Sequence, residues 1–200
     1  QYFGRNKVTY ETYNFHVMGT DHFDLHFYPN KYPEGAQAIT DVARMTERWY
    51  ARQSDLMNHT FNVRKPVILY ENQTDFQQTN IISNLGEGTG GVTEALKSRL
   101  IMPLTGRYAD TDHVMGHEMV HVFQYDIALQ GRGMRGLQAM GQLPLWMIEG
   151  MAEYLSIGPN DPQSALWVRD ALLRDALPSY KDLSRRMREY FPYRWGHAFW

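Results

Sequence analysis

The chain has 200 residues, of which 43% are hydrophobic and 21% are charged, so it is expected to fold as one domain or as two small lobes around a cleft. The formal net charge of −2 argues against nucleic acid or anionic lipid as the main partner. The absence of cysteine excludes disulfide scaffolds, Cys-bound metals and thiol catalysis, and no apolar run reaches the roughly 18 residues needed to span a membrane.

Two strands are predicted near the start of the chain. Residues 9–18 alternate with aromatic side chains and are expected to be extended. In residues 22–28, Phe23, Leu25 and Phe27 alternate with polar side chains, which is typical of a strand with one buried face.

A long helix and further strands follow. Residues 36–58 carry apolar side chains on one helical stripe, and residues 66–70 form a short apolar run that predicts a buried strand. The glycine-rich segment 86–91 lacks the Lys-Ser/Thr of a phosphate-binding loop, so it is interpreted as a turn. It leads into two more predicted strands, residues 92–96 and 99–104.

The second half of the chain predicts helices. Asp110 or Thr111 is expected to be the N-cap of the first of these helices, which is expected to end at Gly131. Pro144 is expected to open the next, which ends before Gly158. Three more helices are predicted over residues 162–176, 179–190 and 193–200.

These elements predict an α+β fold. A mixed, twisted β-sheet lobe over residues 1–105 would be followed by a helical lobe over residues 106–200, with the active-site helix between them, and the whole of 1–200 would form one catalytic domain. The chain ends on Ala198-Phe199-Trp200 with no polar tail. We therefore expect it to be truncated at the carboxyl terminus.

The motif His117-Glu118-Met119-Val120-His121 is the strongest chemical signal. Residues four apart lie on one face of a helix, about 6 Å apart along its axis, so both imidazoles can reach one zinc ion. Glu118 is one step round, where it can touch a metal-activated water without ligating the metal. The plainer interpretation is a helix with two histidines that face a cleft.

A pair of acids on the next predicted helix strengthens the hypothesis of a metal site. Glu149 and Glu153 lie four residues apart on the next predicted helix, among apolar neighbours. A buried carboxylate needs a partner or a metal. We predict Glu149 as the third metal ligand and Glu153 as the acceptor of an N–H from a ligand histidine. The alternative is a solvated acidic face.

Four other histidines are candidates for a place in or near the site. His113 extends the stripe of His117 and is interpreted as a partner of the site or a surface residue. His197 is four residues from Tyr193 and is expected either to face the same cleft as a catalytic residue or to be packed. His22 and His26 lie on the polar face of a strand and are expected to be solvated.

The two motifs together resemble a known group. The His-Glu-x-x-His segment followed by Trp-x-x-Glu-Gly-x-Ala-Glu-Tyr at 146–154 is similar to the gluzincin branch of zinc metallopeptidases. The resemblance implies a zincin-like fold, one Zn²⁺ per chain and Glu118 as general base.

Two further segments resemble aminopeptidase-N and leukotriene-hydrolase enzymes. Phe191-Pro192-Tyr193-Arg194-Trp195-Gly196 is similar to their Pro-Tyr-Glu-Lys-Gly segment, and the likeness implies that Tyr193 stabilises the tetrahedral intermediate. Residues 90–94 stand where those enzymes keep a Gly-x-Met-Glu-Asn strand. Only the Gly and Glu positions match, so recognition of a free amino terminus by Glu94 does not follow.

Most of the chain resembles the peptidase-like amino-terminal domains of bacterial envelope proteins, many of which continue into a β-propeller. The resemblance is strongest over residues 86–200. It implies a secreted, periplasmic or cell-envelope location and a β-propeller beyond Trp200 in the full-length protein.

We therefore expect zinc-dependent hydrolysis of peptide bonds in a peptide or protein substrate, with Glu118 as general base and Tyr193 and His197 donating to the oxyanion. The main alternative is a catalytically silent zincin-like domain that serves binding or scaffolding in a larger envelope protein. A di-iron site is a third reading, because Glu118-x-x-His121 is also Glu-x-x-His. That site needs two such motifs, and the chain has one.

Overall fold

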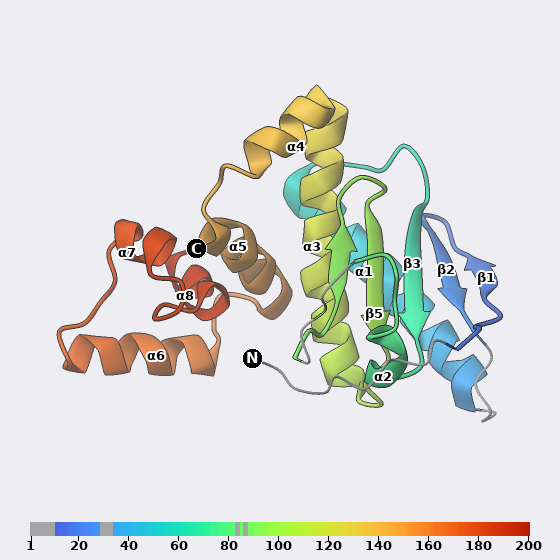
Figure 1. The fold of residues 1–200 in the computed structure, drawn as a ribbon, viewed down its shortest axis with the longest axis horizontal. Helices are drawn as coiled ribbons and strands as arrows, with labels where there is room; N and C mark the ends of the chain where they lie inside the picture. Colours follow the sequence, from blue (N-terminus) through green and yellow to red (C-terminus); the bar gives the residue numbers. More distant parts are fainter. Residues whose placement is uncertain (1–10, 29–33, 83–84, 86–87) are drawn as a thin grey trace, which may run out of the picture.

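The computed structural model describes residues 11–28, 34–82, 85 and 88–200, and it confirms the predicted α+β class (Figure 1). Its strands form one sheet in the order β1-β2-β3-β5-β4. The pairs β2/β3 and β3/β5 are parallel, whereas β1 and β4 pair antiparallel at the two edges. The strands are β1 His16–Gly19, β2 Phe23–Phe27, β3 Lys65–Tyr70, β4 Val92–Glu94 and β5 Arg99–Pro103.

One face of the sheet is covered by two long helices, α1 (Glu34–Met57) and α3 (Tyr108–Arg132) (Figure 1). Helix α1 also provides the crossover that the parallel pair β2/β3 requires. The two helices approach closely at Gly116, where an added Cβ would lie 2.6 Å from the Trp49 ring. The predicted helical stripe of α1 is buried in this core. The core places the middle of α3, with the His-Glu-x-x-His motif, beneath β4 and β5.

Helices α4 to α8 lie beyond α3, on the side away from β1 and β2 (Figure 1). Helix α5 is the nearest of the carboxyl-terminal group to α3 and packs against it, and α8 packs against α5. These helices are α4 Met134–Met140, α5 Leu145–Ile157, α6 Pro162–Leu173, α7 Tyr180–Arg185 and α8 Pro192–Phe199, and a single-turn helix α2, Gln73–Phe76, precedes β4.

Helices α5 and α8 cross with their backbones in contact. A Cβ at Gly150 would lie 2.4 Å from the carbonyl carbon of Gly196, and a Cβ at Gly196 would lie 2.3 Å from the carbonyl oxygen of Trp146. Only glycine therefore fits at either position. The close crossing sets the start of α8, which carries Tyr193, against the helix that carries Glu149.

Several predicted boundaries are corrected. Helix α3 begins after Arg107, which provides no side-chain cap, so the prediction of Asp110 or Thr111 as its cap is wrong. It also runs past Gly131 to Arg132, and its C-cap is Gly133, whose positive φ of 56° favours glycine. Helix α5 follows Pro144 and ends before Gly158, as predicted.

The other differences are smaller. The helix predicted over 179–190 stops at Arg185, and the sequence signals did not predict α2 or α4. Residues 9 and 10 of the first predicted strand and residues 86 and 87 of the predicted turn lie outside the described residues. Within the part of the chain that the structure describes, no helix combines the length and apolar character needed to cross a membrane.

Candidate metal centre

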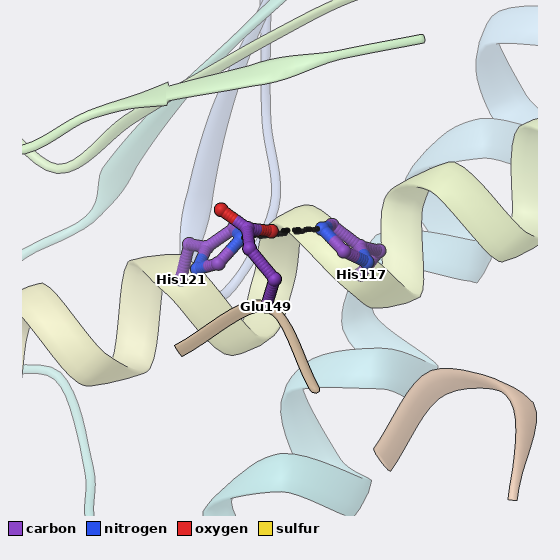
Figure 2. Close-up of side chains that lie close together, drawn as sticks. All are labelled: His117, His121 and Glu149. Carbon is purple, nitrogen blue, oxygen red and sulfur yellow. Dashed lines mark hydrogen bonds and ion pairs between the residues drawn. The ribbon is translucent and has the colours of Figure 1, made fainter. Parts of the chain in front are cut away.

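Three side chains from two helices converge on one point. His117 and His121 project from α3, and Glu149 projects toward them from α5 (Figure 2). Oε2 of Glu149 lies 3.2 Å from Nε2 of each histidine, and the two Nε2 atoms are 3.2 Å apart. Both imidazoles are buried, with exposed fractions of 7% and 6%.

The spacing of these three atoms fits a tetrahedral metal ion. Ligand atoms 2.0–2.1 Å from a tetrahedral zinc lie about 3.3 Å from one another, which matches the 3.2 Å separations. His117, His121 and Glu149 are also the one group of at least three His or acidic side chains within the described ranges whose candidate ligand atoms lie within 4.8 Å of one another. The cluster can therefore hold a metal ion, as its sequence spacing predicts.

The second nitrogen of each imidazole lies close to a side-chain oxygen. Nδ1 of His117 lies 2.9 Å from Oε1 of Glu153, and Nδ1 of His121 lies 2.8 Å from Oε1 of Gln124. The amide nitrogen of Gln124 donates to the carbonyl of Ile148, which leaves its oxygen to accept from the ring. A proton on each Nδ1 would direct both Nε2 lone pairs toward the common point.

Without a metal, a proton takes its place in this cluster. Burial lowers the pKa of His117, but hydrogen bonds to Glu149 and Glu153 outweigh it and raise that pKa to about 10. Burial raises the pKa of Glu149, yet its bonds to His117 and His121 lower it to about 2. The cluster therefore favours a positive charge at its centre, either a shared proton or a cation.

Glu118 lies beside the cluster, buried to an exposed fraction of 6%. Its carboxylate Oε2 accepts a hydrogen bond of 2.7 Å from the Thr93 hydroxyl on β4. Together with His117, Tyr193 and Val114, it lines a cavity of about 460 Å³. Glu118 therefore borders an open space next to His117.

Tyr193, at the start of α8, closes another side of this cavity. Its ring stacks on that of His117 with centroids 5.5 Å apart. Burial and the negative charges of Glu149 and Glu118 raise the pKa of the Tyr193 hydroxyl well above its usual value. The hydroxyl therefore keeps its proton and remains a hydrogen-bond donor at neutral pH.

Glu153 is the centre of a buried ionic network. Besides His117, its Oε1 lies 3.4 Å from Nε2 of His113, and its Oε2 lies 3.2 Å from Nη1 of Arg194. Arg194 also reaches Asp161, the cap of α6, at 3.2 Å. These bonds to His113 and His117 hold the pKa of Glu153 well below its usual range despite its burial. The network links helices α5, α6 and α8 to His117 of the candidate site.

Two other residues considered from the sequence, the predicted catalytic His197 and the doubtful Glu94, lie elsewhere. His197 does not join the cluster, because its Nε2 is 2.8 Å from the Gly158 carbonyl and it lines a separate groove beside α6. Glu94 pairs with Arg99 at 3.0 Å and accepts from the backbone N–H of Leu96. The carboxylate of Glu94 is thus engaged within its own hairpin.

The strand histidine His22, expected to be solvated, is partly exposed, with a side-chain exposed fraction of 36%, and also has protein partners. Its ring stacks on Tyr50 with centroids 3.7 Å apart, and its Nδ1 lies 2.7 Å from Oε2 of Glu47.

Sequence reasoning missed three residues of the site: Thr93, Gln124 and Arg194. Gln124 is three residues from His121, so its place on the same helical face was a usable signal. Thr93 and Arg194 come from other elements, and their contacts depend on the sheet edge and on the crossing of α5 and α8. No local pattern in the sequence marks them.

Comparison with known proteins is consistent with this geometry. No curated protein matches the chain. A family described as "BSP: Peptidase of plants and bacteria" matches residues 5–182. The match includes the whole sheet, the His-Glu-x-x-His helix and both acids of α5, whereas Tyr193 and Arg194 lie beyond it. Since the match spans most of its length, the chain belongs to this family of plant and bacterial peptidases.

Proposed function

We propose that the chain is a zinc-dependent peptidase whose metal is held by His117, His121 and Glu149. The observation that carries the proposal is the convergence of three ligand atoms at mutual distances of 3.2 Å, with a side-chain oxygen within 2.9 Å of the other nitrogen of each imidazole. Two neutral imidazoles and one carboxylate are a donor set typical of catalytic zinc, with a fourth position left open.

A bound zinc ion acts as a Lewis acid, which polarises a carbonyl and acidifies a water molecule. The protein groups carry the remaining steps. Glu118 accepts the proton of the attacking water and delivers it to the leaving amine. Tyr193 donates its hydroxyl proton as a hydrogen bond to the oxygen on which negative charge develops. The stacking of the Tyr193 ring on His117, beside the cavity that Glu118 lines, supports this role.

The resemblance to gluzincins and to aminopeptidase-N supports the same assignment of Glu118 and Tyr193. The position of His197 supports no direct part in the chemistry, so we leave it out of the proposed catalytic set. A secreted or envelope location and a following β-propeller stay part of the proposal, resting on resemblance alone.

The test separates an enzyme from a silent scaffold. Wild type and Glu118→Gln are loaded with zinc and assayed on a broad peptide panel, with Glu47→Gln on α1 as a control that removes a carboxylate paired with His22. We expect Glu118→Gln to keep its zinc and to lose about 10²- to 10⁴-fold in kcat, while the control stays active. Equal inertness of wild type and Glu118→Gln would favour the scaffold.

The role of Tyr193 is tested with Tyr193→Phe, which keeps the ring on His117 and removes only the hydroxyl. Loss of one oxyanion donor typically lowers kcat by about 10²- to 10³-fold. We expect that loss with zinc content unchanged. An unchanged kcat in Tyr193→Phe would remove Tyr193 from the mechanism.

A further inference from the structure

The edge strand β4 makes a direct contact with the proposed general base. Oγ1 of Thr93 lies 2.7 Å from Oε2 of Glu118 and 3.2 Å from the backbone carbonyl oxygen of the same residue. A threonine hydroxyl carries one proton, so it donates to one of these acceptors at a time. The shorter bond to the charged carboxylate is the stronger one, and its length is typical of a charge-assisted O–H···O⁻ bond.

The sheet register explains why Thr93 reaches this acid. In the antiparallel pair of β4 and β5, Thr93 lies opposite Leu100, and directly paired residues share one face of a sheet. Leu100 packs in the core with α3 residues such as Met119. The Thr93 side chain therefore faces α3, while its neighbour Val92 packs on the opposite face beside Tyr70.

The backbone just before Thr93 also lies against the side chain of Glu118. A Cβ at Gly91 would lie 2.9 Å from Cγ of Glu118 and 3.2 Å from its Oε1. Glycine at this position allows the strand to approach the acid, and the strand then limits the side-chain rotamers open to it. Glu118 is thus held on one side by a steric wall and at one oxygen by a hydroxyl.

We propose that Thr93 is a positioning residue that fixes the carboxylate of Glu118 in the orientation needed to accept a proton. This inference rests on the proposed function, since it assigns Thr93 a role through the general base. A glutamate has three side-chain torsions, and one held oxygen restricts the last of them. Holding Oε2 leaves Oε1 as the proton acceptor. A catalytic group that is free to rotate loses its alignment with the reacting atoms, and small misplacements are costly.

The experiment compares Thr93→Val, which keeps the shape and removes the hydroxyl, with Thr93→Ser, which keeps the hydroxyl. Thr46→Val is the matched control, because Thr46 is fully buried on α1 and its hydroxyl donates to the Val42 carbonyl. We expect Thr93→Val to lower kcat by about 10- to 100-fold with KM and zinc content unchanged. Thr93→Ser and Thr46→Val should retain most of the wild-type kcat.

A second variant tests the steric wall. Gly91→Ala should push Glu118 aside and lower kcat, whereas Gly131→Ala, where an added Cβ meets no atom within 4 Å, should not. Crystal structures give a readout that does not depend on activity. Glu118 should occupy one conformer in wild type and Thr93→Ser, and a displaced or multiple conformer in Thr93→Val.

The possible outcomes separate this inference from the proposed function. An unchanged kcat and an unchanged Glu118 conformer in Thr93→Val would overturn the role of Thr93 while leaving zinc catalysis intact. Loss of zinc together with activity in Thr93→Val would also overturn it, since the residue would then act on the metal site. If wild type itself shows no turnover, the proposed function fails, and the Glu118 conformers alone decide whether Thr93 positions the acid.

Discussion

Helix α3 carries two buried ionic clusters little more than one helical turn apart, and they are organised differently. The first is the candidate metal centre around His117 and His121. The second is centred on Asp126, which is 3% exposed and lies against the side chains of His59, Lys65 and Gln130. Both contain a histidine and a carboxylate, so neither burial nor composition alone distinguishes a candidate site from a structural one.

The two clusters differ in what the lone pairs of their acceptor atoms face. In the second cluster, Oδ1 of Asp126 binds the ammonium of Lys65, and Oδ2 lies 2.8 Å from Nε2 of His59 and 2.6 Å from the amide nitrogen of Gln130. Donors surround the acceptors and the opposite charges balance. In the first cluster, two ring nitrogens and a carboxylate oxygen face one another. Donors complete a structural cluster, whereas acceptors that face each other need a cation or a proton between them.

The largest effect is expected from breaking the second cluster. Asp126→Ala leaves the ammonium of Lys65 buried without its counter-ion, which typically costs about 3–5 kcal/mol of folding free energy. Zinc binding per folded chain should not change. Chemical denaturation and zinc analysis check both, with the exposed Asp55→Ala on α1 as a control that should change stability little. A loss of zinc in folded Asp126→Ala would show that the two clusters are not independent.

The next effect concerns the support of the metal ligands. Glu153→Gln keeps the shape of the side chain but removes the charge that faces His117 and Arg194. Outer partners of metal ligands typically contribute about 10- to 100-fold in metal affinity or activity. We expect a loss of that size in zinc affinity, measured by competition with a chelator. An unchanged affinity would reduce Glu153 to a structural partner like Gln130.

The smallest effect is a pH dependence of the stability of the metal-free protein. The pKa of His117 is raised from 6.5 to about 10, so its stabilising contribution is complete below 6.5 and is lost as the pH rises toward 10. The pKa of Glu149 is lowered from 4.5 to about 2, so its contribution is present above 4.5 and is lost as the pH falls toward 2. The contribution of this pair should therefore be greatest between pH 4.5 and 6.5.

Thermal melts from pH 5 to 9, with and without zinc, measure this dependence. Because zinc replaces the shared proton, the rise in Tm on adding zinc should grow as the pH increases above 6.5. His117→Ala should abolish both the zinc effect and its pH dependence. A zinc-induced shift that stays constant across this range would contradict the account of a shared proton.

Much of the first cluster could be predicted from the sequence because its members repeat at helical spacing. His117 and His121 share a face of α3, and Glu149 and Glu153 share a face of α5, so two local patterns were sufficient to nominate all four. The main elements were predicted for the same reason, since β2, β3, α1 and α5 carry strong periodic or cap signals.

The remaining features depend on contacts between distant segments. Thr93 reaches Glu118 through the register of β4 on β5, and Arg194 reaches Glu153 through the glycine crossing of α5 and α8. His197 was expected in the cleft on the basis of its spacing from Tyr193, yet its ring is held by the Gly158 carbonyl. Spacing in the sequence predicts which residues share a face of a helix or strand. It does not predict which residues of distant segments contact that face.

The central claim is that His117, His121 and Glu149 form one zinc site, and metal analysis tests it most directly. Wild type and Glu149→Gln are purified without chelator, equilibrated with equal zinc and quantified per folded chain. The account predicts one zinc ion per chain in wild type and a large loss in Glu149→Gln, with the fold retained. Wild type without zinc, or Glu149→Gln with a full complement, would contradict it.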